Sequence, residues 1–167
     1  MAKIIIGVMG AGDRATSEDL KSAYLLGQAI AENNWVLLTG GRNVGVMDAA
    51  SRGAKASDGL IVGILPGSNK TDMSETVDIA IVTDLGSARN NINVLSADVV
   101  IACGIGLGTA SEIALALKNG KPVILLQPTK LTYSFFASLS DRTLFAAETV
   151  DQAIALIQEI LATSEHA

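Results

Sequence analysis

The sequence contains almost no cysteine or histidine. Cys103 is its one cysteine and His166 is its one histidine, next to the last residue. A single cysteine excludes a disulfide within the chain and is typical of proteins in a reducing compartment. A single histidine excludes a metal centre built from several histidines, and its place at the chain end argues against a histidine-based triad. We therefore expect a cytoplasmic protein without a metal site of its own.

Charged and aromatic residues are also scarce. They make up 17% and 4% of the 167 residues, and the formal net charge is −5. Nucleic-acid-binding proteins present a basic face and stacking rings, so no nucleic-acid partner is expected. No apolar run approaches the length that crosses a bilayer, and the first residues do not have the composition of a signal peptide. We therefore expect no membrane partner either.

Hydrophobic residues, in contrast, are abundant, at 49% of the chain. A soluble monomer with so little charge would expose much apolar surface to water. The composition therefore predicts a homo-oligomer with a buried interface.

Short apolar runs alternate with segments of helical periodicity along the chain. The runs lie at 3–9, 35–39, 60–65, 78–83, 98–103 and 122–127, with a weaker one at 143–147. The helical segments lie at 17–33, 46–56, 87–96, 109–119 and 150–163, with a short one at 131–139. Continuous apolar runs are typical of strands that are buried on both faces. The pattern predicts one α/β domain over residues 1–167, a Rossmann-like, doubly wound parallel sheet with helices on both faces.

Three of the apolar runs end in glycine-rich turns that lead into helical segments. The turns contain Gly10 and Gly12, then Gly40, Gly41 and Gly45, then Gly104, Gly106 and Gly108. Backbone N–H groups at a helix N-terminus bind anions, and phosphate above all. The first turn fits the dinucleotide pattern G-x-G-x-x-A, but no acidic residue ends the second strand to bind a ribose, so NAD is not expected. Phosphate binding and a plain tight turn both remain open for this segment.

Basic residues follow five of the predicted strands. They are Arg14, Arg42, Lys70, Arg89 and Lys130. In an open parallel sheet these loops share one edge, where ligands bind. The pattern predicts a basic rim that captures a small anionic ligand, although solvated polar loops would give the same residues.

The segment that starts at Arg89 breaks a local rule. A cation at a helix N-terminus opposes the helix dipole, which indicates that Arg89 has a function. Asn90 and Asn93 follow it, and amides can both donate to and accept from a heterocycle. A polar helix start is the alternative for the two asparagines.

The last glycine turn continues through Leu107 and Thr109 to Glu112. Thr109 and Glu112 have the spacing of a capping box, in which each side chain caps the backbone N–H of the other. The same spacing brings Glu112 near the expected ligand, so both roles stay open for it. Cys103, just before this turn, is read as a small buried hydrophobe, with contact to the ligand as the less favoured alternative.

Several of these motifs resemble a known superfamily. Gly40-Gly41-Arg42-x-x-Gly45, Arg89 and Gly106-x-Gly108-Thr109-x-x-Glu112 are similar to the LONELY GUY and lysine-decarboxylase-like proteins, over residues 3–127. In LONELY GUY enzymes a Rossmann-like dimer cleaves the N-glycosidic bond of a nucleoside 5′-monophosphate, and the resemblance implies Arg89 and Glu112 as the catalytic pair. The chain departs from that pattern at Cys103-Gly104-Ile105-Gly106, which replaces Pro-Gly-Gly, and at Asn90, where a lysine is usual.

The stretches 40–50, 88–95 and 102–112 more closely resemble a sister branch, the molybdenum cofactor carrier proteins. The resemblance implies a homo-oligomer, typically a tetramer, that binds the phosphorylated molybdopterin cofactor, protects it from oxidation and releases it to molybdoenzymes, with no catalytic residues required. The glycine turns suit the phosphate, arginine and asparagine suit the pterin edge, and the basic rim suits the anionic dithiolene–molybdenum end. The residues expected to bind the cofactor are Gly10, Gly12, Arg14, Gly40, Gly41, Arg42, Gly45, Arg89, Asn90, Asn93, Gly104, Gly106, Leu107, Gly108, Thr109 and Glu112.

Two other functions are kept as alternatives to the carrier. The first is a phosphoribohydrolase that uses Arg89 and Glu112 on a nucleoside monophosphate. The second is a nucleotide-sensing module that passes its signal to a partner, although no effector domain accompanies it.

Overall fold

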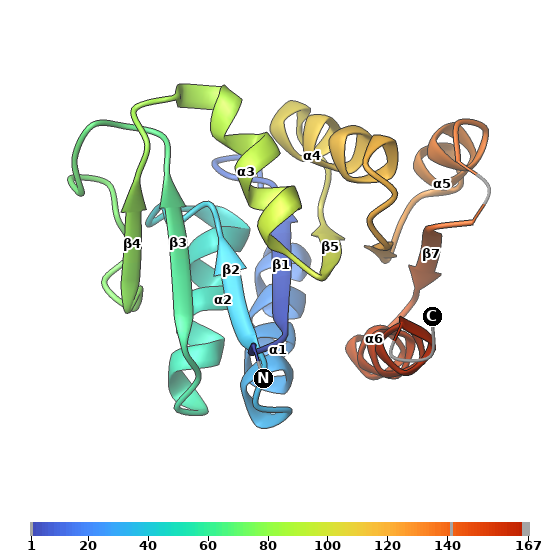
Figure 1. Cartoon of the computed structure of the whole chain (residues 1–167), viewed down its shortest axis with the longest axis horizontal. Helices are drawn as coiled ribbons and strands as arrows, with labels where there is room; N and C mark the ends of the chain where they lie inside the picture. The colour runs from blue at the N-terminus through green and yellow to red at the C-terminus, as the bar shows by residue number, and fades with distance from the viewer. Residues whose placement is uncertain (1, 141, 165–167) are drawn as a thin grey trace.

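Seven parallel strands form one sheet in the order β4-β3-β2-β1-β5-β6-β7 (Figure 1). The structure is a computed structural model that describes residues 2–140 and 142–164, so His166 lies outside the described residues. The strands are β1 (Ile5–Gly10), β2 (Val36–Thr39), β3 (Ile61–Leu65), β4 (Ile79–Val82), β5 (Val99–Cys103), β6 (Val123–Leu126) and β7 (Leu144–Ala147). Every predicted apolar run forms a strand, including the weaker one at 143–147.

The helices lie on both faces of this sheet. They are α1 (Ser17–Glu32), α2 (Gly45–Ala56), α3 (Arg89–Ser96), α4 (Leu107–Lys118), α5 (Lys130–Ala137) and α6 (Val150–Ser164), with a short 3₁₀ helix, η1 (Gly86–Ala88), before α3. Buried side chains of α1, α2 and α6 share one hydrophobic cluster, and those of α3, α4 and α5 share the other. The predicted Rossmann-like, doubly wound α/β fold is therefore confirmed.

Strand β5 shows why the apolar runs are continuous. Val99, Ile101 and Cys103 pack into the first cluster, whereas Val100 and Ala102 pack into the second. Successive side chains of a strand point to opposite faces of the sheet, so a strand covered on both faces must be apolar at every position. Each of these five residues is at most 1% exposed.

Helices α1 and α2 approach each other closely because each has a glycine at the contact. A Cβ atom on Gly27 would lie 2.0 Å from the carbonyl oxygen of Ala50, and one on Gly53 would lie 1.9 Å from that of Tyr24. Each of these helices follows a strand, α1 after β1 and α2 after β2, so both helices begin at the carboxyl edge of the sheet. Because β1 lies between β2 and β5, the chain direction across the sheet reverses there, and such a switch point forms a crevice for ligands.

Candidate functional site

A cavity of about 490 Å³ lies above the carboxyl ends of the central strands. This volume is within the usual range for small-molecule sites. The predicted binding residues that line it are Gly10, Gly12, Arg14, Gly40, Arg42, Arg89, Asn90, Gly106, Leu107, Gly108, Thr109 and Glu112. The topology thus brings together parts of all three glycine turns and the start of α3.

The first glycine turn forms one wall of the cavity. A Cβ atom on Gly10 would lie 2.3 Å from the carbonyl oxygen of Cys103 and 2.4 Å from a methyl group of Val46, so only glycine fits here. Gly12 is less crowded, and Arg14 follows as an exposed side chain on the cavity wall. This turn therefore combines close backbone packing on one side with an accessible cation on the other.

The second turn reaches the cavity through Gly40 and Arg42 but not through Gly41 or Gly45. Gly45 has a φ of +58°, and a Cβ atom on it would lie 2.3 Å from the carbonyl oxygens of Ala11 and Gly12. The next N–H, of Val46, donates to Ala11 at 2.9 Å. The N-terminus of α2 is therefore packed against the first turn.

The third turn leaves a helix N-terminus open to the cavity. Helix α4 begins at Leu107, its N-cap is Gly106, and no side chain caps it. A Cβ atom on Gly106 or Gly108 would meet nothing within 4 Å, so the space above the first N–H groups is free. Gly104 does not line the cavity; it has a φ of +68°, and a Cβ atom on it would lie 2.8 Å from the carboxyl carbon of Asp19. The open end of α4 can thus donate N–H groups to an anion.

Of the two roles left open for Glu112, the capping box with Thr109 is not formed. Because α4 begins two residues earlier than predicted, Thr109 lies inside the helix and is only 2% exposed. Glu112 faces Asn93 of α3 instead, and its Oε1 accepts a hydrogen bond from Asn93 Nδ2 at 2.8 Å. Glu112 is therefore free to line the cavity.

Glu112 is a buried carboxyl group, 7% exposed. Burial raises its pKa above the ordinary value of 4.5, while the hydrogen bond from Asn93 and the positive charge of Arg89 oppose this rise. Asn93 is fully buried and does not line the cavity, and its Oδ1 has no hydrogen-bond partner. Asn90, one helical turn away, lines the cavity and donates from Nδ2 to Ser111 Oγ at 2.8 Å.

Arg89 forms part of the floor of the cavity and is 9% exposed. Its Nη1 donates to the backbone carbonyls of Gly40 and Ile64, whereas its Nε is buried without a partner. Burial lowers the pKa of this guanidinium. The negative charge of Glu112 opposes this shift, and the positive charge of Arg42 adds to it. Arg89, which lies unfavourably at the N-terminus of α3, is thus a buried residue whose hydrogen bonds connect this helix to the sheet.

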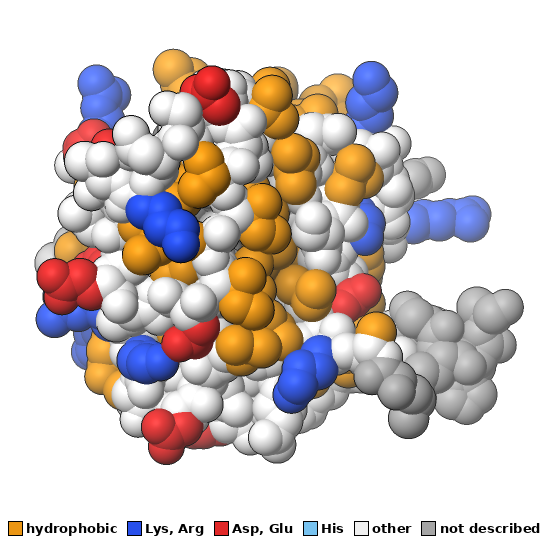
Figure 2. All heavy atoms as spheres, turned by 60° about the vertical axis from the view of Figure 1, so that its left-hand side comes forward, with side chains coloured by type: hydrophobic (Ala, Val, Ile, Leu, Met, Phe, Trp, Pro, Cys, Tyr) orange, Lys and Arg blue, Asp and Glu red, His pale blue; other side chains and the backbone are white. Residues whose placement is uncertain are grey.

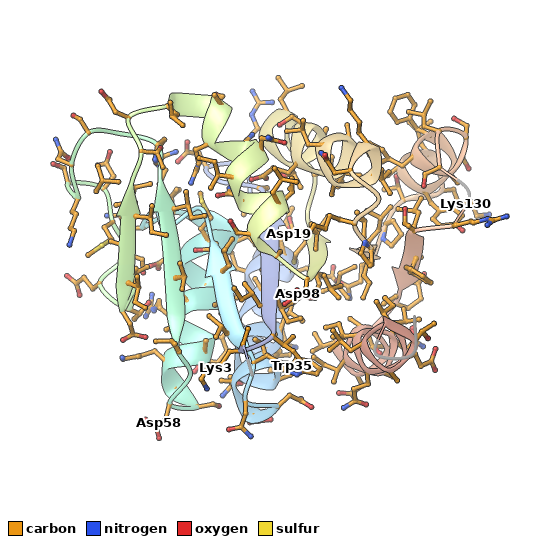
Figure 3. The ribbon with its side chains drawn as sticks, viewed as in Figure 1. Lys3, Asp19, Trp35, Asp58, Asp98 and Lys130 are labelled. Carbon is orange, nitrogen blue, oxygen red and sulfur yellow. The ribbon has the colours of Figure 1, made fainter. Side chains whose placement is uncertain are left out.

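The predicted basic rim is only partly assembled at the cavity. Arg14, Arg42 and Arg89 line it, but Lys70 and Lys130 do not. Figure 3 shows Lys130 extending outward from the α5 end of the molecule. The positive charge at the cavity comes from three arginines, which offer planar forks of N–H donors to an anion.

Cys103 is buried in the core, which confirms the favoured prediction of a small buried hydrophobe. Its thiol is 1% exposed, does not line the cavity and donates to the backbone carbonyl of Asp19 at 3.4 Å. Burial, with a smaller effect of Asp19, raises its pKa to about 12. Within residues 2–140 and 142–164, no group of three His, Cys, Asp or Glu side chains could hold a metal ion.

Sequence reasoning missed several residues of the cavity. Met9, Met47, Pro66 and Ser87 line it, and the 3₁₀ turn before α3 closes one side. Met47 follows the second glycine turn within the first turn of α2, which was the available signal for it.

Among the helices of the described chain, none is long and apolar enough to cross a membrane.

The fold and the cavity define a Rossmann-like protein with a basic, glycine-lined cavity at the switch point of its sheet. The chain belongs to the SLOG cluster4 family, whose model matches residues 3–154.

Solved structures agree with this assignment. The molybdenum cofactor binding protein of Rippkaea orientalis superposes with a TM-score of 0.95 at 63% identity, over 96% of this chain and 99% of that one. The molybdenum cofactor carrier protein of Chlamydomonas reinhardtii superposes with a TM-score of 0.92 at 49% identity, over 96% and 99%. A cytokinin riboside 5′-monophosphate phosphoribohydrolase of Mycobacterium tuberculosis is 30% identical over 131 residues, 74% of this chain and 70% of the enzyme. The resemblance seen in the sequence motifs is confirmed.

Proposed function

We propose that this protein binds the molybdenum cofactor and acts as its carrier. The proposal depends above all on one observation: a single cavity of about 490 Å³ combines an uncapped helix N-terminus with Arg14, Arg42 and Arg89. The cofactor has an anionic phosphate at one end and an anionic dithiolene–molybdenum group at the other. The high similarity to a cofactor-binding protein, 63% identity over nearly the whole chain, supports the same assignment.

The residues present suit the three parts of this ligand. The N–H groups at the start of α4, beside Gly106 and Gly108, suit the phosphate. Arg14 is exposed and Arg42 is half-buried, so both can reach an anionic group at the mouth of the cavity and suit the metal-bearing end. Asn90 and the buried side chains of the floor suit the polar pterin ring between the two ends.

The carrier role implies partners for the protein. Molybdoenzymes would receive the cofactor, and the cytoplasm, where a free cysteine such as Cys103 stays reduced, would be the compartment. We further infer a homo-oligomer, because β4 leaves apolar surface uncovered. Ile79, Ile81, Leu85 and Leu95 are each 44–49% exposed. Figure 2, which brings the β4 side forward, shows hydrophobic side chains gathered in a band across this face.

An anaerobic calorimetric titration with freshly released molybdenum cofactor tests the proposal. We expect saturable binding near one site per subunit. Replacing Arg42 with alanine should weaken it about tenfold or more, since a hydrogen bond to a charged group contributes roughly 1.5–3 kcal/mol. Lys70→Ala is the matched control, because Lys70 follows a neighbouring strand but does not line the cavity. Absence of binding heat at several temperatures would contradict the carrier function.

A second candidate function is hydrolysis of a nucleoside 5′-monophosphate at the N-glycosidic bond. The observation in its favour is that Arg89 and Glu112, which the resemblance implies as a catalytic pair, line the same cavity. Burial raises the pKa of Glu112, as general acid catalysis by a carboxyl group requires. Release of ribose 5-phosphate from AMP or an N6-substituted analogue would show this activity. Loss of that release in Glu112→Gln, with the fold intact, would assign it to this site.

A further inference from the structure

Two carboxylates line the cavity, and their surroundings differ. Asp13 is exposed to solvent on the first glycine turn, whereas Glu112 is 7% exposed in the wall. A buried carboxylate repels anions and needs hydrogen-bond donors to replace the water that it has lost. The part of a ligand that contacts Glu112 must therefore present N–H or O–H groups.

The donors available within the protein satisfy only one of the two oxygens of Glu112. Asn93 Nδ2 donates to Oε1 at 2.8 Å, and no group of the described residues donates to Oε2. The positive charge of Arg89 acts on the carboxylate through space, while its Nη1 is engaged with Gly40 and Ile64. Glu112 lines the cavity, and its carboxylate is thus left with lone pairs that no described group of the protein uses.

Asn93 also fixes the direction of this carboxylate. It is fully buried between α3 and α4, so its amide cannot turn toward solvent. Asn93 therefore acts as a positioning residue, which occupies one lone pair of Oε1 and leaves Oε2 and the second lone pair of Oε1 for the ligand.

We propose that Glu112 recognises the N–H edge of a 2-amino-4-oxopyrimidine ring, the edge that pterins share with guanine. This inference rests on the proposed function and deepens it by naming the part of the ligand that the wall selects. A ring of this type presents two parallel donors, a ring N–H and the exocyclic 2-amino group. Oε2 can accept from one of them, and the second lone pair of Oε1 can accept from the other. Adenine places an acceptor nitrogen beside its amino group, and hypoxanthine lacks the amino group, so each offers fewer matched donors.

The charges around the cavity agree with this orientation. The phosphate and the dithiolene–molybdenum group of the cofactor are both anionic, so Glu112 would repel either of them. The pterin ring is the neutral part and carries the N–H donors. Arg14 and Arg42 are more exposed than Glu112, so the anionic ends of the cofactor would lie near these arginines, toward the mouth of the cavity.

A matched pair of nucleotides tests the inference on the unmodified protein. GMP and IMP differ only in the 2-amino group, and both carry the 5′-phosphate. We expect the protein to bind GMP about tenfold more tightly than IMP, because one hydrogen bond to a charged acceptor is lost. Equal affinities, including no binding of either nucleotide, would overturn the proposal.

The variant Glu112→Gln shows whether this carboxylate is the cause. Its side chain has nearly the same shape but presents an amide, so the preference for GMP should disappear while circular dichroism shows an unchanged fold. Glu75→Gln, which removes the same charge from an exposed residue outside the cavity, should keep the preference. A preference that persists in Glu112→Gln would overturn the role of Glu112.

Anaerobic titration with the cofactor separates this inference from the proposed function. Binding to the unmodified protein that falls about tenfold in Glu112→Gln supports both. Equal binding to the two proteins overturns the role of Glu112 and leaves the carrier function standing. If the cofactor does not bind to the unmodified protein, the carrier function fails, and the ratio of GMP to IMP affinity alone decides the inference.

Discussion

The guanidinium of Arg89 donates to the backbone carbonyl of Gly40 and so joins the first residue of α3 to the turn that follows β2. The same nitrogen donates to the carbonyl of Ile64 in β3. Arg89 is only 9% exposed, so these hydrogen bonds are made by the protein rather than by solvent. Arg89 therefore holds one wall of the cavity together and also supplies positive charge to it.

The arginines of the cavity should separate stability from binding. Arg89→Ala removes the side-chain donor of two backbone carbonyls, and we expect it to lower the free energy of unfolding by about 1–3 kcal/mol as well as weaken cofactor binding. Arg42→Ala should weaken binding but change stability by less than about 0.5 kcal/mol, because no described group is held by that side chain. Urea denaturation of the ligand-free proteins measures the first effect and calorimetry the second. Equal stability of the two variants would contradict the structural role of Arg89.

The buried carboxyl group of Glu112 should make stability depend on pH in an unusual direction. Its pKa is raised in the folded protein, so the folded state binds more protons than the unfolded state above the ordinary value of 4.5. Stability then falls as pH rises through the window from 4.5 to the raised pKa, and it stays lower above that window. The free energy of unfolding of Glu112→Gln, relative to the unmodified protein, should therefore increase with pH across this window.

Comparison with the variant isolates this effect from the other carboxylates, which titrate in both proteins. Urea denaturation at several pH values between about 4 and 8 gives the difference directly. A difference that does not change with pH, or that changes in the opposite direction, would show that folding does not raise the pKa of Glu112.

Two glycines of the cavity region should respond oppositely to the same substitution. Gly45→Ala requires a side chain at a φ of +58° and places its Cβ 2.3 Å from two carbonyl oxygens of the first turn. We expect it to lower the free energy of unfolding by more than about 1 kcal/mol, from the left-handed backbone alone. Gly108→Ala meets no neighbour within 4 Å and lies in α4, so it should leave stability unchanged or raise it by up to about 1 kcal/mol. Thermal melts of the two ligand-free variants measure these effects. A melting temperature of Gly45→Ala at or above that of Gly108→Ala would contradict the prediction.

These glycines show how far the sequence alone could predict the site. The alternation of apolar runs and helical segments was sufficient to predict every strand, and the pattern is clearest in a central strand such as β5, where burial on both faces leaves no polar position. The glycine turns also marked the correct edge of the sheet. Which glycines line the cavity was not predictable, since Gly45 is required by the approach of the first turn, a contact between distant segments.

Local rules failed where tertiary contacts decide the outcome. The spacing of Thr109 and Glu112 fits a capping box, yet α4 begins earlier and Glu112 pairs with Asn93 of another helix. Lys130 follows a strand as Arg42 does, but its strand, β6, lies away from the switch point. The unfavourable position of Arg89 was the more reliable signal, because a buried cation at a helix N-terminus needs compensating contacts, and the carbonyls of Gly40 and Ile64 supply them.

The uncovered face of β4 leads to the last prediction. Ile81 lies beside Ile64 in the parallel register, so both side chains point to the face that carries α3, yet Ile81 is 44% exposed whereas Ile64 is 1% exposed. If a second copy of the chain covers this face, Ile81→Glu should bury a charge in the interface and dissociate the oligomer to the 17.2 kDa chain. Leu25→Glu, on the opposite face and 43% exposed, is the matched control and should keep the assembly intact. Light scattering after size-exclusion chromatography measures the mass, and an unchanged mass for Ile81→Glu would show that the interface lies elsewhere.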